Sequence, residues 1–321
     1  MDVDVDHSQI MDHSQIVDVT MHHDITWQSM EEDFLKFWST IVDVPAGLST
    51  VEQGTPIWHM GRAARLTASN FGSVADLNPY CSANELLLRM VYPSFISSPA
   101  CQWGNDMEPV ACRSYLTEIG TLGPDSNVHH LSSGIHINPQ YPFLGASPDG
   151  IVTVDAPVLA VPLCYECPVN TKYDLLEHRF DPIDGMVQVY NWQYPLSRPQ
   201  RFNVEFKCPF RKVLYPTIPK MYYCQIQGVC QVIKLPYTHF SVWTPTKSSL
   251  VCYPTNDRFW HEFLYPKLLA FYFNRFLPFA FLKQMNLLQP GVLVPTVPRA
   301  VCQQLVAASR KIATKYRTWS I

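Results

Sequence analysis

The sequence predicts a single domain of the α/β or α+β class, in which strands and helices alternate along the chain. The chain has 321 residues, 47% of them hydrophobic, which is enough for a sizeable core. Short apolar runs with strand periodicity alternate with patterns of helical periodicity. The 27 prolines, 13 glycines and only 16% charged residues indicate many fixed turns and argue against a collagen-like or coiled-coil protein.

The first part of the chain predicts an acidic leader followed by helices. Residues 1–33 hold nine acidic side chains and no Lys or Arg, and they repeat the unit DHSQI, so we expect a disordered leader. Order is expected to begin near residues 30–40, where aromatic residues predict a short helix. Further helices are expected from about Thr67, over 83–91 and over 108–119, because their apolar positions recur at helical spacing.

The remaining elements follow from apolar periodicity and turn residues. Strands are expected at 134–137, 143–146, 150–154, 202–206, 237–243 and 250–253. Helices are expected at 220–233, 256–284 and 298–316. Charged residues and a proline interrupt the apolar stretch 263–288, which predicts a buried helix and no membrane partner.

The net charge of −3 hides a strong asymmetry along the chain. Residues 34–210 carry 10 basic and 16 acidic groups, whereas residues 211–321 carry 14 basic and only two acidic groups. Such a basic block attracts a polyanion if its side chains share one face. The alternative is a set of solvated side chains scattered around helices, and composition alone leaves both interpretations open.

Ten cysteines are spread along the chain without the dense spacing of a disulfide framework. No apolar signal segment opens the sequence. We therefore expect an intracellular protein with reduced thiols, nuclear or cytoplasmic. Cys164 and Cys167 have CxxC spacing, but no second pair follows at zinc-finger distance, so a zinc site is the less favoured interpretation.

Two short motifs carry residues with metal-binding chemistry. Ser147-Pro-Asp-Gly places Asp149 at a turn, and Glu205-Phe-Lys places Glu205 and Lys207 on the same face of a strand. Two neighbouring carboxylates bind Mg²⁺, and a lysine beside them orients or deprotonates the attacking water and offsets developing negative charge. Alone, the first motif is an ordinary turn and the second an exposed ion pair, so the motifs by themselves leave the function open.

Five sequence segments, taken together, favour one of the possible functions. Residues 51–72 read VEQGTPIWHMGRAARLTASNFG, and four blocks follow, at 103–108, 147–150, 205–210 and 223–227. In this order they resemble the YqaJ/lambda-exonuclease-like viral recombinase family of the PD-(D/E)XK nuclease superfamily. The resemblance implies a restriction-endonuclease-like core, with a central mixed β-sheet flanked by helices. It also implies a Mg²⁺-dependent 5′→3′ exonuclease that acts on double-stranded DNA ends in recombination or repair.

The resemblance assigns the metal site residue by residue. Asp149 and Glu205 are expected to be metal ligands, with the carbonyl of Phe206 as a backbone ligand. Lys207 is expected to be the catalytic lysine. The implied cofactor is Mg²⁺, with Mn²⁺ as an alternative.

Further roles also follow from the resemblance. Glu108 is expected to support the metal site through water, and Gln225 to position the nucleophilic water. Arg62, Ser69 and Ser147 are expected to bind the terminal 5′-phosphate, a role that suits the planar guanidinium fork and the hydroxyl groups. The ordinary alternatives are a solvated Arg62, a Ser69 that only begins a helix, and a Gln225 on a helix surface.

Three other residues of these blocks have structural interpretations. Trp58 and Trp103 are expected in the core rather than as base-stacking platforms, and for Arg65 a simple solvated position is the ordinary alternative. None of the three is assigned to the site.

The segment between the two acidic motifs departs from the family. Compact members have a short hairpin here, whereas residues 151–204 intervene in this chain. Loop-closure cost grows slowly with length, so the two halves of the site are still expected to meet at adjacent strand ends. We therefore expect one nuclease-like domain over 34–321, with an insertion at about 151–204 and basic C-terminal helices.

Two other functions use the same core. One is a structure-selective endonuclease, which the predicted 5′-phosphate residues disfavour. The other is a catalytically silent DNA-end-binding module, which the intact acidic pair and lysine disfavour. The expected partners are double-stranded DNA ends, a single-strand annealing protein and further copies of the chain as a homo-oligomer.

Overall fold

A five-stranded mixed sheet organises the half of the protein that carries the acidic motifs. It is seen in a computed structural model that describes residues 21–93, 98–121, 128–154, 200–215 and 218–318. The strands, in spatial order, are β2 (Val128–Leu131), β5 (Gly150–Val154), β6 (Gln200–Lys207), β7 (Tyr237–Trp243) and β8 (Ser248–Pro254). Only β6 and β7 are parallel, and the other neighbours are antiparallel. This sheet and the helices around it confirm the predicted α/β class with a central mixed sheet flanked by helices.

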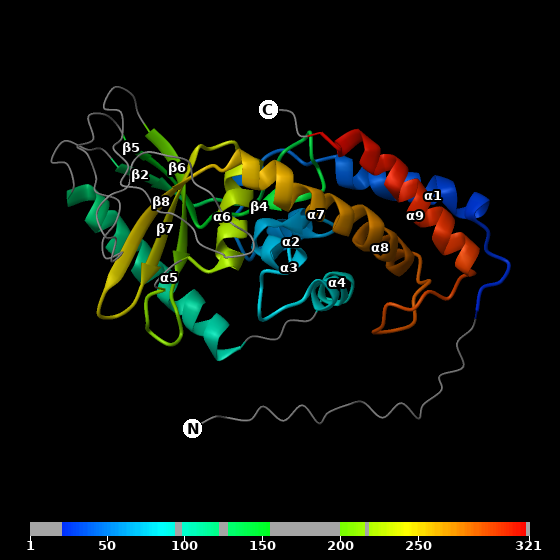
Figure 1. Cartoon of the computed structure of the whole chain (residues 1–321), viewed down its shortest axis with the longest axis horizontal. Coiled ribbons are helices and arrows are strands. Elements are labelled where there is room, and N and C mark those ends of the chain that lie inside the picture. The colour runs from blue at the N-terminus through cyan, green and yellow to red at the C-terminus, as the bar shows by residue number, and fades with distance from the viewer. Residues whose placement is uncertain (1–20, 94–97, 122–127, 155–199, 216–217, 319–321) are drawn as a thin grey trace.

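Helices cover the sheet and build a separate layer beside it. The α-helices are α1 (Trp27–Val42), α2 (Pro56–Arg62), α3 (Phe71–Val74), α4 (Ala83–Val91), α5 (Pro99–Thr121), α6 (Lys220–Ile233), α7 (Tyr265–Phe271), α8 (Leu277–Gln284) and α9 (Arg299–Ala313). Short 3₁₀ segments are η1 (Leu48–Thr50), η2 (Ala68–Asn70) and η5 (Thr314–Tyr316), and π segments are η3 (Phe259–Leu264) and η4 (Tyr272–Phe276). Figure 1 shows the sheet at one end of the elongated molecule and α1, α8 and α9 at the other.

Strand β6 has apolar residues on one face and the catalytic candidates on the other. Phe202, Val204 and Phe206 pack in an apolar cluster with side chains of α5. Because side chains alternate across a strand, Glu205 and Lys207 face the opposite side, toward α6. The sheet therefore separates the packing face under α5 from the polar face under α6.

The parallel pair β6 and β7 is connected by α6, which gives a β-α-β crossover. Lys234, in the left-handed conformation, follows the last residue of α6. The predicted bounds 220–233 and 237–243 are those of α6 and β7. The crossover thus places the polar face of β6 directly beneath α6.

A second, three-stranded sheet lies beside the first. Its order is β1 (Leu66–Thr67), β4 (Leu144–Ala146), β3 (His136–Ile137), with β1 and β4 parallel. The carboxyl ends of β1 and β4 meet at one edge, so residues after Thr67 approach residues after Ala146. The turn at 147–149 then leads directly into β5 of the larger sheet.

Several predicted helices have different ends in the structure. Helix α1 begins at Trp27, inside the segment predicted as leader, because Thr26 and Ser29 form a capping box; residues 1–20 lie outside the described part. Helix α5 begins at Pro99 and continues through Pro109, so Glu108 lies in mid-helix rather than at the start. The segment near Thr67 is a strand end and a 3₁₀ turn before the short α3, and β2 was not predicted.

The predicted helix 256–284 is a run of alternating π and α segments. Pro266 and Pro278 each occupy the second position of an α segment, directly after a π segment. A proline removes one backbone donor and crowds the preceding turn, and in this run a wider π turn precedes each proline. The run is buried in the aromatic core, and none of the described helices has the length and apolar character to cross a membrane.

The long connection between the acidic motifs leaves and returns at neighbouring strand ends. Val154 at the end of β5 pairs with Gln200 at the start of β6. Residues 155–199 therefore interrupt an antiparallel pair without separating its strands, as predicted, although both strands extend into the predicted 151–204 insertion. Cys164 and Cys167 lie outside the described residues.

Close contact between α3 and α6 gives a stability prediction. A Cβ on Gly228 of α6 would lie 2.3 Å from Cδ2 of the buried Phe71. Gly228→Ala is therefore expected to lower the free energy of unfolding by about 1–3 kcal/mol, through overpacking, as measured by chemical denaturation. Gly104→Ala on α5 meets nothing within 4 Å and serves as the control, with a gain of up to about 1 kcal/mol in helix propensity. Equal stabilities for the two variants would contradict the packing argument.

Candidate active site

The two acidic motifs meet where β5 begins and β6 ends. Asp149 immediately precedes β5, and its Oδ2 accepts a 2.6 Å hydrogen bond from the backbone N–H of Phe206. Glu205 is only 2% exposed. Its Oε1 accepts a 2.6 Å hydrogen bond from Nζ of Lys207, two residues further along the same strand. The structure thus brings Asp149, Glu205 and Lys207 together.

The two oxygens of Glu205 have unequal surroundings. Oε1 also accepts a hydrogen bond from Nε2 of Gln225, on α6. Oε2 is buried and has no hydrogen-bond partner among the described residues. A buried, unpartnered carboxylate oxygen next to a second carboxylate suits a hard cation such as Mg²⁺. In the described part of the chain, no group of three or more His, Cys, Asp or Glu side chains is placed to hold a metal ion.

Electrostatics at the acidic pair favour added positive charge. Burial, followed by repulsion from Glu205, raises the pKa of Asp149 well above its usual range. Burial alone would lower the pKa of Lys207, but attraction to Glu205 and Asp149 raises it above its usual value. The ammonium group is therefore charged at neutral pH and lies beside the two carboxyl groups.

Glu108 lies at the rim of a cavity beside the pair. The cavity, of about 1070 Å³, is also lined by Lys207 and by Tyr222 of α6. The Tyr222 ring centroid lies 4.9 Å from Nζ of Lys207. Partial desolvation and then repulsion from Glu205 raise the pKa of Glu108, although its side chain is exposed. Among the described residues Glu108 makes no hydrogen bond to Asp149 or Glu205, so it acts on them through space.

The predicted phosphate-binding residues converge around Trp58. Its Nε1–H donates a 3.1 Å hydrogen bond to Oγ of Ser147. The guanidinium carbon of Arg62, four residues later on α2, lies 4.3 Å from the Trp58 ring centroid. Nη2 of Arg62 contacts Oγ1 of Thr67 at 3.2 Å and Oγ of Ser69 at 3.5 Å. We call Trp58, Arg62, Thr67, Ser69 and Ser147 the guanidinium cluster.

The charge of Arg62 is desolvated within this cluster. Burial lowers its pKa to about 10, which still leaves it cationic at neutral pH. Its partners are hydroxyl groups and an aromatic face, and no carboxylate of the described residues lies within 4.0 Å of it. A cation removed from water without a counter-ion favours an incoming anion.

The acidic pair and the guanidinium cluster adjoin each other. Ser147 of the cluster is two residues before Asp149 of the pair. A small cavity of about 240 Å³ is lined by both Ser69 and Gln225, and Gln225 contacts Glu205. The predicted residues therefore lie in neighbouring parts of the fold, linked by the Ser147–Asp149 turn and by the cavity between Ser69 and Gln225. Their functional roles stay a prediction.

Three residues outside that assignment differ from expectation. Arg65 is buried and donates to the backbone carbonyls of Ile41, Gly61 and Pro142, which excludes the solvated alternative. Trp58 and Trp103 were expected in the core, but both are half-buried and lie against cations. The i, i+4 spacing of Trp58 and Arg62 on a helix was the available signal.

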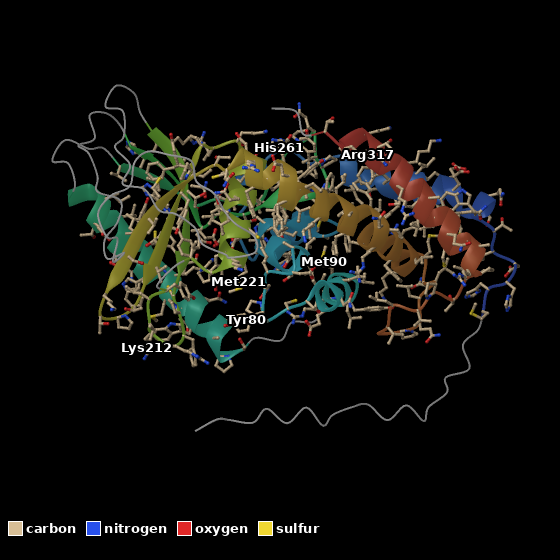
Figure 2. The ribbon with its side chains drawn as sticks, in the orientation of Figure 1. Tyr80, Met90, Lys212, Met221, His261 and Arg317 are labelled. Carbon is tan, nitrogen blue, oxygen red and sulfur yellow. The ribbon has the colours of Figure 1, made fainter. Side chains whose placement is uncertain are left out.

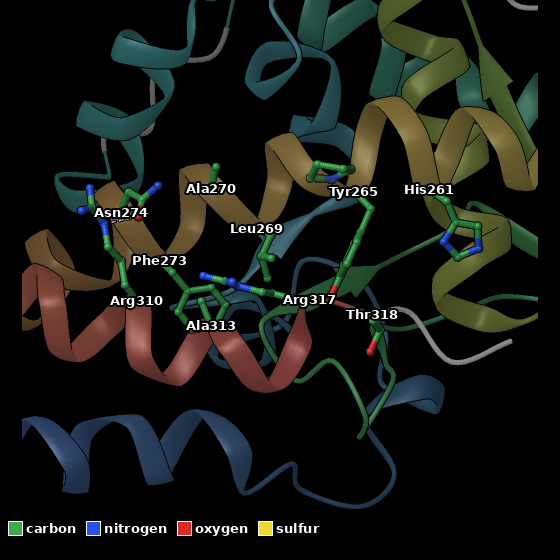
Figure 3. Close-up of a pocket in the computed structure, with 11 residues that line it drawn as sticks. His261, Tyr265, Leu269, Ala270, Phe273, Asn274, Arg310, Ala313, Arg317 and Thr318 are labelled. Carbon is green, nitrogen blue, oxygen red and sulfur yellow. Dashed lines mark hydrogen bonds between the residues drawn. The ribbon is translucent and has the colours of Figure 1, made fainter.

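A second large cavity lies away from the acidic pair. It has a volume of about 800 Å³ and is bounded by α7, η4 and α9. Figure 3 shows Arg310 of α9 reaching toward Asn274, to which its Nε donates at 2.9 Å. The hydroxyl of Tyr265 donates to the carbonyl of Tyr316. Among the described residues that line this cavity there is no Asp or Glu.

Comparisons with known proteins give one family match. The profile of the "YqaJ-like viral recombinase domain" family matches residues 57–234, more than half of the chain. Among solved structures, the chain is similar to the alkaline exonuclease LHK-Exo from Laribacter hongkongensis, with a TM-score of 0.45 and 15% identity over 81% of this chain and 99% of that one. The structure of LHK-Exo in complex with dAMP matches with the same TM-score and coverage and 16% identity. No curated protein matches the chain significantly.

The raised pKa of Asp149 gives a prediction for the metal-free protein. A carboxyl group with a raised folded-state pKa costs stability as pH rises above its unfolded value of about 3.9. In EDTA at pH 8, Asp149→Asn is expected to be more stable than the wild type by roughly 1 kcal/mol or more, because a buried charge is removed. The difference should shrink toward pH 4, as followed by denaturant unfolding. Glu52→Gln, at an exposed position, should change stability by less than about 0.5 kcal/mol; a wild type as stable as Asp149→Asn at pH 8 would contradict the prediction.

Proposed function

The chain belongs to the YqaJ-like viral recombinase domain family, and from this premise we propose that it is a Mg²⁺-dependent exonuclease of double-stranded DNA. It would hydrolyse phosphodiester bonds from 5′ ends and so prepare DNA for recombination. The proposal depends on one observation: a group of buried acids lies next to a partly buried arginine, and neither has a full set of partners of opposite charge. One is the acidic pair with an unpartnered oxygen, and the other is the desolvated Arg62.

The acidic pair supplies the hydrolytic half of the proposal. Asp149, Glu205 and the carbonyl of Phe206 would hold the cation, which fits the buried Oε2 of Glu205. When bound, Mg²⁺ would supply a Lewis acid for the phosphate and lower the pKa of a water ligand. The backbone N–H of Phe206 fixes the orientation of Asp149.

The neighbouring side chains control charge and orientation. Lys207 is cationic because the carboxylates raise its pKa, so we assign it to stabilising negative charge on the phosphate rather than to accepting a proton. Gln225 holds Oε1 of Glu205 through its amide, which leaves Oε2 for the cation. Glu108, with its raised pKa at the cavity rim, would contact the site through water.

The guanidinium cluster supplies the preference for a DNA end. Arg62 would pair with the terminal 5′-phosphate, and the hydroxyls of Ser69 and Ser147 would donate to its remaining oxygens. A terminal phosphate offers more charge than an internal diester, so this pocket favours ends over continuous strands. The basic C-terminal third, with 14 basic and two acidic residues, would add attraction for the duplex.

Neutralising Asp149 tests the hydrolytic assignment. Asp149→Asn is expected to lower kcat on linear, 5′-phosphorylated duplex DNA by about 10²–10³-fold, while duplex binding persists. EDTA should abolish the wild-type activity, and Mg²⁺ should restore it. Asp106→Asn changes an exposed acid of α5 and should retain wild-type kcat.

Three results would contradict this prediction. Activity that persists in EDTA would remove the metal-dependent mechanism, as would full activity of Asp149→Asn. Equal degradation of circular and linear duplexes would identify a structure-selective endonuclease instead. Binding of DNA ends without any hydrolysis would identify a catalytically silent end-binding module.

Removing Arg62 tests the end-recognition assignment separately. Arg62→Ala is expected to reduce the ratio of rates on 5′-phosphate and 5′-hydroxyl duplexes by about tenfold or more, because a charge-assisted hydrogen bond contributes about 1.5–3 kcal/mol. Arg299→Ala removes an exposed arginine at the start of α9 and should leave the ratio unchanged. An unaltered ratio in Arg62→Ala would remove the phosphate assignment while leaving the hydrolytic one intact.

A further inference from the structure

Tyr80 is an exposed aromatic residue held on a fixed turn. Its side chain is 78% exposed, the largest value among the exposed large hydrophobic residues described. Its backbone N–H donates to Oδ1 of Asn78 at 3.0 Å, and Nδ2 of Asn78 donates to Oγ of Ser73 at 2.9 Å. Two residues later, Ser82 and Glu85 form the capping box that begins α4. The backbone is therefore anchored on both sides, while the ring projects from it.

The position of this ring separates it from an ordinary surface tyrosine. Tyr80 lines both the large cavity that contains Glu108 and Lys207 and the small cavity that contains Ser69 and Gln225. In Figure 2 its label lies just below that of Met221 of α6, which lines the same two cavities. Within the described part of the chain the Tyr80 ring makes no contact with another aromatic ring, and its phenol interacts electrostatically with Tyr215, which lines the same large cavity. Single exposed aromatics are common on protein surfaces, but this one stands where two cavities of the candidate site meet.

The chemical structure of a DNA 5′ end indicates which group would occupy the small cavity. The 5′-terminal nucleotide carries the terminal phosphate on one side and the first phosphodiester, the bond to be cleaved, on the other. Ser69 belongs to the cluster proposed to bind the terminal phosphate, and Gln225 contacts the acidic pair proposed to act on the diester. A cavity lined by both residues lies between these two phosphate positions. Arg89 also lines it and adds a cation.

Resting on the proposed function, we propose that Tyr80 stacks on the base of the 5′-terminal nucleotide. Every nucleobase offers a π-face, so an aromatic ring stacks on it with little regard to sequence. Such stacking requires that the terminal base leave its pair in the duplex, and a ring on a rigid turn offers a replacement for the lost stacking. Tyr80 would thus determine how well a terminal nucleotide is held during cleavage, without touching the reacting atoms.

The test compares two 5′-phosphorylated duplexes that differ only in whether the 5′-terminal nucleotide carries its base or is abasic. Binding is measured by fluorescence anisotropy with Ca²⁺ in place of Mg²⁺. The wild type should bind the duplex with the base about tenfold or more tightly than the abasic one, since stacking contributes about that factor per base. Tyr80→Ala should lose this preference, and Tyr80→Phe should keep it. Leu35→Ala, which truncates an exposed side chain on α1, should behave as the wild type.

The possible outcomes distinguish a failure of the stacking role of Tyr80 from a failure of the exonuclease function. If the wild type cleaves duplex ends and Tyr80→Ala keeps the full preference for the terminal base, the stacking role is overturned and the exonuclease assignment stands. Loss of preference in both Tyr80→Ala and Tyr80→Phe would overturn ring stacking in favour of a role for the hydroxyl. A wild type that neither binds nor cleaves duplex ends would overturn the proposed function itself. Retained folding of Tyr80→Ala is checked by its unfolding midpoint, which an exposed ring should not alter.

Discussion

The burial of β6 on both faces is the constraint on which the rest of the site depends. One set of alternate residues must be apolar to pack under α5, which leaves the other set, including Glu205 and Lys207, directed toward α6. Antiparallel pairing with β5 then brings Asp149 to the backbone of Phe206. A shift of one residue in this pairing would exchange the two faces and place the apolar side chains where the charges now lie.

The site contains two uncompensated charge centres of opposite sign. Asp149 and Glu205 repel one another across a buried space, and Arg62 has lost its water without gaining a counter-ion. Both conditions cost stability in the free protein and are relieved by ligands of opposite charge. In the proposed function, a cation would relieve the first condition and a terminal phosphate the second.

Sequence patterns predicted the elements whose periodicity reflects simple burial. The bounds of α6 and β7 followed from apolar spacing alone, because both are packed over most of their length. The changes of helix type at Pro266 and Pro278 were not predicted. The π and α segments follow one another without a gap, so the apolar residues still recur at roughly helical spacing. Arg65 was missed for another reason: its three carbonyl partners come from segments far apart in sequence. The roles of the site residues were assigned from the family resemblance. Asp149 and Glu205 lie too far apart in the sequence for their spacing alone to show that they meet.

The pairing of Val154 with Gln200 has a consequence for how such proteins are found. Because the chain departs from and returns to one hairpin end, the number of residues between the acidic motifs carries no information on whether the motifs meet. Evolution is free to lengthen this excursion without rebuilding the sheet beneath it. A pattern search that allowed only a short gap there would discard this chain, and with it any relative whose hairpin has been extended in the same way.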